Sequence, residues 1–151
     1  MSRWVARTER TVSEKIPAAP EEVREFYVDL HNIKKVHPLV VEVHTTGREQ
    51  TADGYQLSYQ VKDRVPLGPL QLRIKYGARL HVPDSGPVTA EARQFPRVRL
   101  RTTVTFEPID DGTLITEHMR IEAPRLLAAM TVNEAVKAHT AMLAGMRECF
   151  G

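Results

Sequence analysis

The chain has 151 residues, of which 42% are apolar and 26% charged, and this size and composition predict one globular domain over residues 1–151. Its 21 Lys and Arg residues against 19 Asp and Glu residues leave a net charge of +2, which does not indicate a nucleic-acid partner. Cys149 is the only cysteine and cannot close an internal disulfide, so we expect a cytoplasmic protein. The longest uncharged run, residues 138–146, is far shorter than the roughly 20 residues of a membrane span, and the start lacks an apolar signal segment. We therefore expect no membrane span.

One strand and two short helices are predicted near the start of the chain. Residues 8–16 alternate in hydrophobicity and stop at Pro17, which is typical of a strand. Pro20 opens a helix, because two acidic residues follow it and apolar residues then recur at steps of three and four. We expect a second short helix over residues 32–36, with Asn32 as its cap.

A long run of strands is predicted for the middle of the chain. Alternating hydrophobicity continues from residue 39 to residue 121, and its longest two-faced stretch is residues 70–81. Turn sequences interrupt it at residues 84–87 and 110–112. The chain then has about seven strands in all, and their short connections favour an antiparallel sheet.

The last segment predicts one long helix. After Pro124, apolar positions and one histidine recur at steps of three and four: Val132, Val136, His139, Leu143, Met146 and Phe150. Because the sheet and this helix each have one apolar face, we expect the helix to lie across the sheet in an α+β fold.

Three segments carry a resemblance to a known superfamily. Residues 12–23 resemble its opening strand and small-residue turn, residues 29–38 its second helix, and residues 121–127 the approach to its last helix. The chain thus resembles the START/Bet v 1-like (SRPBCC) superfamily, and within it the bacterial polyketide cyclase/dehydrase-like members. This resemblance implies the helix-grip fold, in which a seven-stranded curved antiparallel sheet wraps around a long C-terminal helix, with two short helices after strand 1.

The same resemblance implies an internal cavity between the sheet and the C-terminal helix. Members of the superfamily bind hydrophobic small molecules of the lipid or polyketide type there, and apolar walls with a few polar groups suit such ligands. On the predicted inward faces, the lining residues would be Val41, Val43, Tyr55, Leu57, Tyr59, Leu72, Ile74, Tyr76, Thr102, Val104, His139, Leu143 and Met146.

His139 interrupts the apolar stripe of the last helix and is therefore expected to face the sheet. A histidine in the cavity can donate to a ligand carbonyl or take a proton from an activated carbon, since its ordinary pKa lies near 6.5. The alternative is a core histidine bonded to a backbone carbonyl. His31, His37, His44 and His81 are expected on the solvated surface.

Glu14 and Glu117 break the apolar faces of the first and last strands. These strands are neighbours in the helix-grip order, so the two carboxylates could meet and act as an acid/base pair, with one pKa raised. The alternatives are a slip of strand parity at a bulge, or an arginine partner for each acid. No catalytic residue is assigned, and Glu14, Glu117 and His139 are the candidates.

Three functions are compatible with these patterns. The first is binding of a hydrophobic small molecule in the cavity; the second is a polyketide aromatase/cyclase that uses cofactor-free acid/base catalysis. The third is a protein-interaction module with a filled core and no ligand. No metal-ligand spacing and no phosphate loop is present in the sequence, so we expect no metal and no cofactor. We expect the protein to be a monomer or a homodimer.

Overall fold

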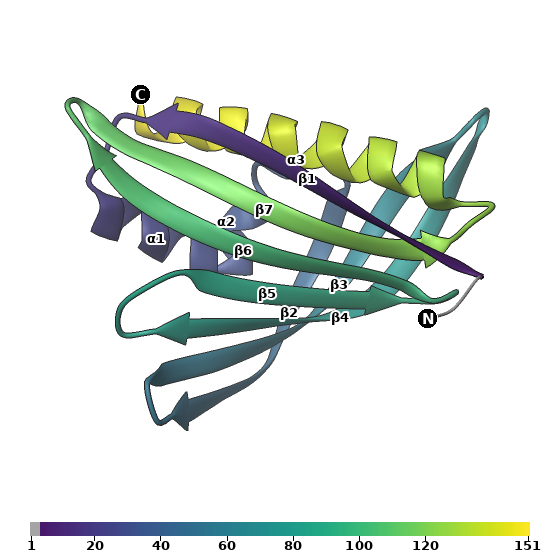
Figure 1. The fold of residues 1–151 in the computed structure, drawn as a ribbon, viewed down its shortest axis with the longest axis horizontal. Coiled ribbons are helices and arrows are strands. Elements are labelled where there is room, and N and C mark those ends of the chain that lie inside the picture. The colour runs from purple at the N-terminus through teal and green to yellow at the C-terminus, as the bar shows by residue number, and fades with distance from the viewer. Residues whose placement is uncertain (1–3) are drawn as a thin grey trace.

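The computed structural model describes residues 4–151 as a curved sheet with helices on one side (Figure 1). The elements in chain order are β1 (Val5–Ile16), α1 (Pro20–Val28), α2 (Leu30–Ile33), β2 (Val40–Thr51), β3 (Gly54–Leu67), β4 (Leu70–Pro83), β5 (Val88–Gln94), β6 (Val98–Ile109), β7 (Gly112–Pro124) and α3 (Ala128–Phe150).

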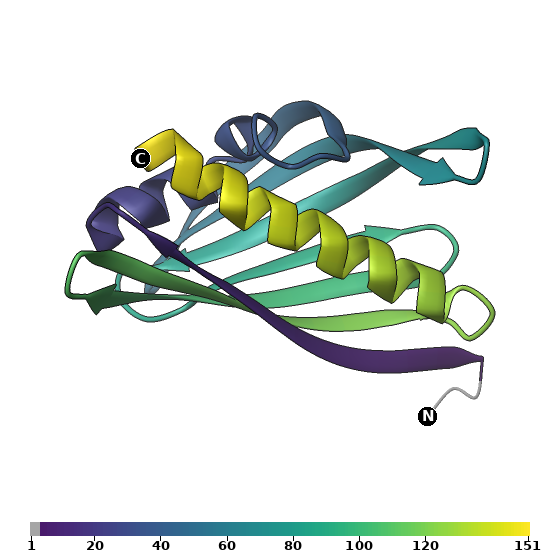
Figure 2. The same cartoon turned by 90° about the horizontal axis from the view of Figure 1, so that it is seen from above.

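The seven strands form one antiparallel sheet in the order β1-β7-β6-β5-β4-β3-β2. Only the β1–β7 contact joins strands distant in sequence, since every other neighbour pair is consecutive. Helix α3 runs across the sheet and packs mainly along β1 and β7 (Figures 1 and 2). The helix-grip fold predicted from the sequence is thereby confirmed. No helix within residues 4–151 is long and apolar enough to cross a membrane.

The second short helix begins earlier than its sequence suggested. It covers Leu30–Ile33, because the Asp29 carboxylate accepts a hydrogen bond from the backbone N–H of His31 at 2.9 Å and so caps the helix. Asn32, the expected cap, instead lies within the helix and donates to the carbonyl of Phe26 at 3.4 Å.

The core fills the space between the sheet and one face of α3. Met142, Leu143 and Met146 of α3 are buried with inward residues of the strands such as Ile115 and Val104. This packing leaves the C-terminal half of α3 tightly held against the sheet.

The β6–β7 turn locks the end of β1 in place. The Thr113 hydroxyl donates to the carbonyl of Ala18 at 2.7 Å, and Gly112 lies against the end of β1. A Cβ added at Gly112 would stand 2.1 Å from the carbonyl oxygen of Ile16, a backbone atom that cannot move aside without shifting β1.

Replacing Gly112 with Ala should therefore lower the free energy of unfolding by about 1–3 kcal/mol. Gly77→Ala is the matched control, because a Cβ at Gly77 meets nothing within 4 Å, and its effect should stay within about 0.5 kcal/mol. Urea unfolding followed by circular dichroism measures both. Equal effects of the two substitutions would contradict this account of the turn.

Candidate functional site

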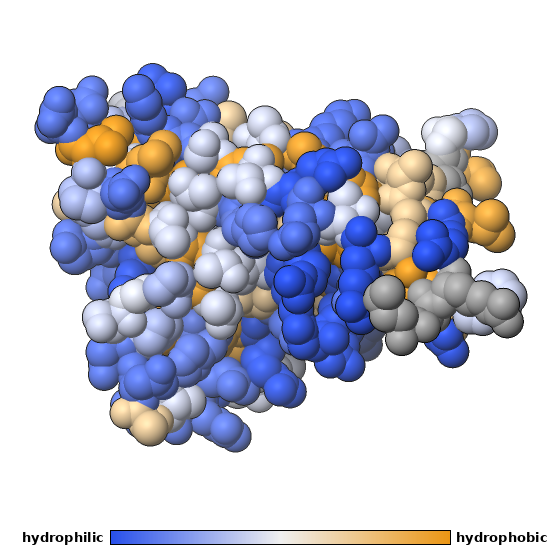
Figure 3. Space-filling model, viewed as in Figure 1, coloured by the Kyte–Doolittle hydropathy of each residue, from blue (hydrophilic) through white to orange (hydrophobic). Residues whose placement is uncertain are grey.

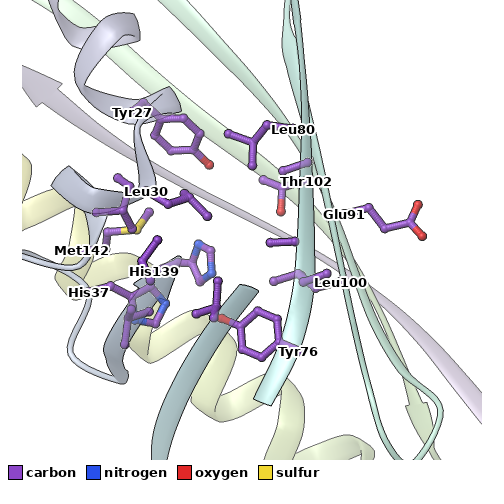
Figure 4. A pocket seen from close by; sticks show the side chains of 17 residues that line it. Tyr27, Leu30, His37, Tyr76, Leu80, Glu91, Leu100, Thr102, His139 and Met142 are labelled. Atoms are coloured by element: carbon purple, nitrogen blue, oxygen red, sulfur yellow. The ribbon is translucent and has the colours of Figure 1, made fainter. Parts of the chain in front are cut away.

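Two adjoining hollows lie between the sheet and the helices, with volumes of about 90 Å³ and about 190 Å³. The two hollows share part of their walls, and the residues that border both are His37, Tyr76, Ala92, Leu100 and His139. The first hollow reaches toward α1 and α2 (Figure 4), and the second reaches toward the start of α3.

Six of the residues predicted from the sequence to line a cavity border these hollows. Tyr76 and His139 border both hollows. Val43 and Thr102 border only the first, and Leu72 and Ile74 border only the second. They come from β2, β4, β6 and α3, so four elements close to one another contribute to the wall.

Other predicted wall residues lie elsewhere. Leu57, Tyr59, Val104, Leu143 and Met146 are buried in the core and border neither hollow. The Tyr59 hydroxyl is satisfied within the core, since it donates to the carbonyl of Val28 at 3.1 Å. Tyr55 is half-buried, with the guanidinium of Arg48 4.1 Å from the centre of its ring.

Val41 is exposed on the outer side of the sheet rather than on the cavity wall. A register shift in the β2–β3 pairing falls between Val40 and Glu42, so the residue parity changes there. Val40 and Val43 border the first hollow in consequence.

A buried carboxylate lies directly behind the first hollow. Glu117 of β7 has no exposed surface, and the Tyr27 hydroxyl of α1 donates to its Oε2 at 2.5 Å. Nδ1 of His139 on α3 donates to the other oxygen, Oε1, at 2.9 Å. Three elements thus meet at one carboxylate, and the ring of Tyr27 is held edge-on to Phe106 with their centroids 5.8 Å apart.

His139 carries the charge that balances Glu117. Burial by itself lowers the pKa of His139, but the charge of Glu117, its hydrogen bond and the charge of Asp63 outweigh burial and raise the pKa above 6.5. Nδ1 is held by Glu117, while Nε2 bonds to no group among residues 4–151 and the ring borders both hollows. When His139 is protonated, its Nε2–H faces a largely apolar space.

His37 was expected on the solvated surface, but it lies against His139 with the ring centroids 5.3 Å apart (Figure 4). Burial and the charge of His139 lower the pKa of His37 to about 3. Its Nδ1 accepts the backbone N–H of Leu39 at 3.2 Å, which requires this nitrogen to be unprotonated. Of the two rings, His139 is therefore the more basic and His37 stays uncharged at neutral pH.

Asp63 and Tyr76 form the other polar pair at the hollows. The Tyr76 hydroxyl donates to Oδ1 of Asp63 at 3.1 Å, and burial raises the pKa of Asp63 to about 6 despite this bond. Asp63 continues the inward parity of Val61 on β3, and extending that alternation by one step would have found it.

Glu14 does not join Glu117. Register places Glu14 opposite Ile115 and Val12 opposite Glu117, and the Glu14 carboxylate meets Arg147 of α3 at 3.3 Å. An arginine partner was one of the alternatives for this residue, whereas the partners of Glu117 are a tyrosine and a histidine.

The family of the chain follows from comparison with known sequences. A family described as polyketide cyclase / dehydrase and lipid transport matches residues 7–149, so the chain belongs to it. No curated protein sequence matches the chain significantly.

Solved structures share the fold at low sequence identity. The protein TTHA0849 from Thermus thermophilus is 20% identical with a TM-score of 0.72, covering 95% of this chain and 94% of that one. The Zhui aromatase/cyclase from Streptomyces sp. R1128 is 14% identical with a TM-score of 0.66, covering 95% and 94%. Ara h 8.0201 is 11% identical with a TM-score of 0.63, covering 93% and 98%. These identities show a shared fold and no more.

Glu117→Gln should lower the pKa of His139, because it removes the charge that holds the proton on the imidazole. Tyr27→Phe is the control, since it leaves the contact between Glu117 and His139 in place. NMR titration of the histidine ring signals measures both variants. A His139 pKa unchanged in Glu117→Gln would contradict the assignment of the charge pair.

His37 should make stability fall as the solution is acidified. The pKa is about 3 in the folded protein against 6.5 in the unfolded chain, so below 6.5 the unfolded chain takes up a proton that the folded protein does not. The free energy of unfolding should then fall more steeply with decreasing pH than in His37→Gln, by at most about 1.4 kcal/mol per pH unit. Denaturant unfolding at several pH values from about 6.5 to 4.5 gives the slope of the free energy of unfolding against pH for wild type and for His37→Gln. Equal slopes in the two proteins would rule out a buried, neutral His37.

Proposed function

We propose that this protein binds an apolar small molecule carrying a carbonyl or hydroxyl oxygen in the two hollows between the sheet and α3. The observation that carries the proposal is the position of His139, whose Nε2–H faces an apolar space while Glu117 holds the other side of the ring. A ligand oxygen that accepts this N–H would be oriented by a charge-assisted hydrogen bond.

The walls around His139 supply the affinity for the apolar part of such a ligand. Aliphatic side chains such as Leu80, Leu100 and Met142 border the first hollow. Burying apolar ligand surface against them contributes about 25 cal/mol per Å², while a few polar groups decide the orientation. The polycyclic or acyl ligands suggested by the family's description have this chemistry.

A second candidate is cofactor-free cyclisation with loss of water, which the chain from Tyr27 through Glu117 to His139 favours. In an aldol closure, the enol carbon attacks a ketone and Nε2–H of His139 gives its proton to the new alkoxide. The neutral imidazole then takes the α-proton and returns it to the departing hydroxyl, which leaves as water. The original enol O–H proton, left on the carbonyl oxygen formed in the closure, then passes to Nε2, so the pair of Glu117 and His139 ends each cycle in its starting charge state.

The ligand proposal is tested with a matched pair of probes, 2-acetylnaphthalene and 2-ethylnaphthalene, which differ in the ketone oxygen. His139→Asn is the informative variant, because an asparagine amide stands near the position of Nδ1 and retains a donor for Glu117, while Nε2 is lost. We expect wild type to bind the ketone about tenfold more tightly than the hydrocarbon, and His139→Asn to bind both equally. Fluorescence titration measures the four affinities.

His118→Asn serves as the control, since His118 pairs with Thr11 and Glu9 on the outer side of the sheet. It should preserve the preference for the ketone. No binding of either probe to wild type, or a preference retained in His139→Asn, would contradict the proposed role of the cavity. Conversion of an enolisable polyketide analogue by wild type would favour the cyclisation candidate over binding alone.

A further inference from the structure

Large apolar side chains protrude at one end of the molecule and lie outside the buried core. We call this set the apolar tip: Trp4, Leu70, Leu72, Phe95, Leu126 and Met130. Phe95 is 92% exposed and Leu126 99% exposed, so these side chains stand clear of the protein surface. Of the exposed large apolar residues in the described chain, Val41 alone lies outside this set.

The apolar tip is assembled from segments far apart in sequence. The β3–β4 turn, the β5–β6 turn, the loop before α3 and the start of β1 all lie at the same end of the molecule in both ribbon views (Figures 1 and 2). The backbone N–H of Arg125 donates to the carbonyl of Trp4 at 2.9 Å, which joins two of these segments. Figure 3 shows hydrophobic side chains gathering where α3 begins, beside strongly hydrophilic ones.

The second hollow opens among these residues. Leu72, Phe95 and Met130 border it, together with Pro96 and Leu127 from the adjoining loops. A surface that covers the apolar tip would therefore also cover the mouth of the hollow.

Cations lie beside the apolar tip on the β3–β4 hairpin. In the register of these strands Arg64 stands opposite Arg73, and Lys62 stands opposite Lys75. Like charges directly opposite one another across a strand pair are destabilising unless an anion compensates them. Lys62 meets Glu42 at 3.2 Å, whereas neither Arg64 nor Arg73 forms an ion pair within residues 4–151.

Glu42 and Asp63 border the same surface hollow as these cations, but neither forms an ion pair with Arg64 or Arg73 among residues 4–151. Asp63 and Glu134 border the second hollow, and Asp63 is bonded to Tyr76. The outer side of the hairpin therefore presents positive charge next to protruding apolar side chains.

We propose that the apolar tip docks on a lipid bilayer that contains anionic lipid, with the mouth of the second hollow facing the bilayer. Single side chains protruding from separate turns can enter the headgroup region of a fluid bilayer, which needs no complementary pockets. Arg64 and Arg73 then bind lipid phosphates in the headgroup region, beside the inserted apolar side chains. This inference goes beyond the proposed function and does not depend on which ligand the cavity takes.

Flotation with vesicles tests the proposal in the absence of any cavity ligand. We use the full chain with vesicles of phosphatidylcholine alone, or of phosphatidylcholine mixed with phosphatidylglycerol, and expect binding mainly to the mixture, weakened by added salt. Leu70→Ser combined with Leu126→Ser should weaken this binding at least tenfold, because both apolar side chains leave the bilayer and neither borders a hollow. Val41→Ser removes an exposed apolar side chain outside the tip but beside Arg64 and Arg73, and its effect should be smaller than that of the tip substitutions.

A second pair of variants tests the charge. Arg64→Gln combined with Arg73→Gln should weaken binding to the anionic vesicles by about fivefold per arginine. Lys34→Gln combined with Lys35→Gln removes two exposed cations after α2 and should leave binding nearly unchanged. Melting temperatures show whether each variant remains folded, and titration with 2-acetylnaphthalene should give unchanged affinity in the tip variant, which separates docking from ligand binding.

Three results would each overturn the proposal. One is the absence of binding to the anionic vesicles. Another is vesicle binding that the arginine substitutions abolish and the tip substitutions leave unchanged. Such binding depends on charge alone and assigns the arginines to a soluble polyanion, such as nucleic acid or an acidic protein. The last is a dimer in size-exclusion chromatography that the tip substitutions convert to a monomer, which assigns the tip to a second copy of this chain.

Discussion

The Glu117 carboxylate has no exposed surface, and its two oxygens must be satisfied inside the protein. Tyr27 bonds one oxygen and His139 the other, so α1, β7 and α3 are tied to the same group. Removing one partner of a buried charge costs about 3–5 kcal/mol, because the other charge is left without compensation. The position of α3 over the sheet and the orientation of the His139 ring therefore depend on this carboxylate.

The same requirement orients one imidazole nitrogen into the cavity. Since Glu117 fixes Nδ1 of His139, the other nitrogen points into the hollows. The charge on His139 in turn helps to keep His37 neutral, and His37 accepts a backbone N–H that only an unprotonated nitrogen can accept. One buried carboxylate thus raises the pKa of His139 and holds one of its nitrogens, which leaves the other nitrogen for a ligand.

Sequence patterns anticipated some parts of the site and missed others for identifiable reasons. His139 and Glu117 stood out because each interrupts an apolar pattern, and the structure joins them to each other rather than to Glu14. His37 was expected on the surface because it flanks the second short helix, whereas the structure places it at the hollows, against His139. Val41 was placed inward by strict alternation, which a register shift in β2 interrupts.

The sequence by itself determined the order of elements, the two-faced strands and the apolar stripe of α3, because hydrophobic periodicity is a local property of neighbouring residues. Tertiary structure alone decided the partners of Glu117, since Tyr27 is 90 residues away and His139 is 22 residues away along the chain. It also decided which inward residues border a hollow and which pack solidly. Those outcomes depend on strand register, on the curvature of the sheet and on how far α3 stands from it, and no local pattern encodes these quantities.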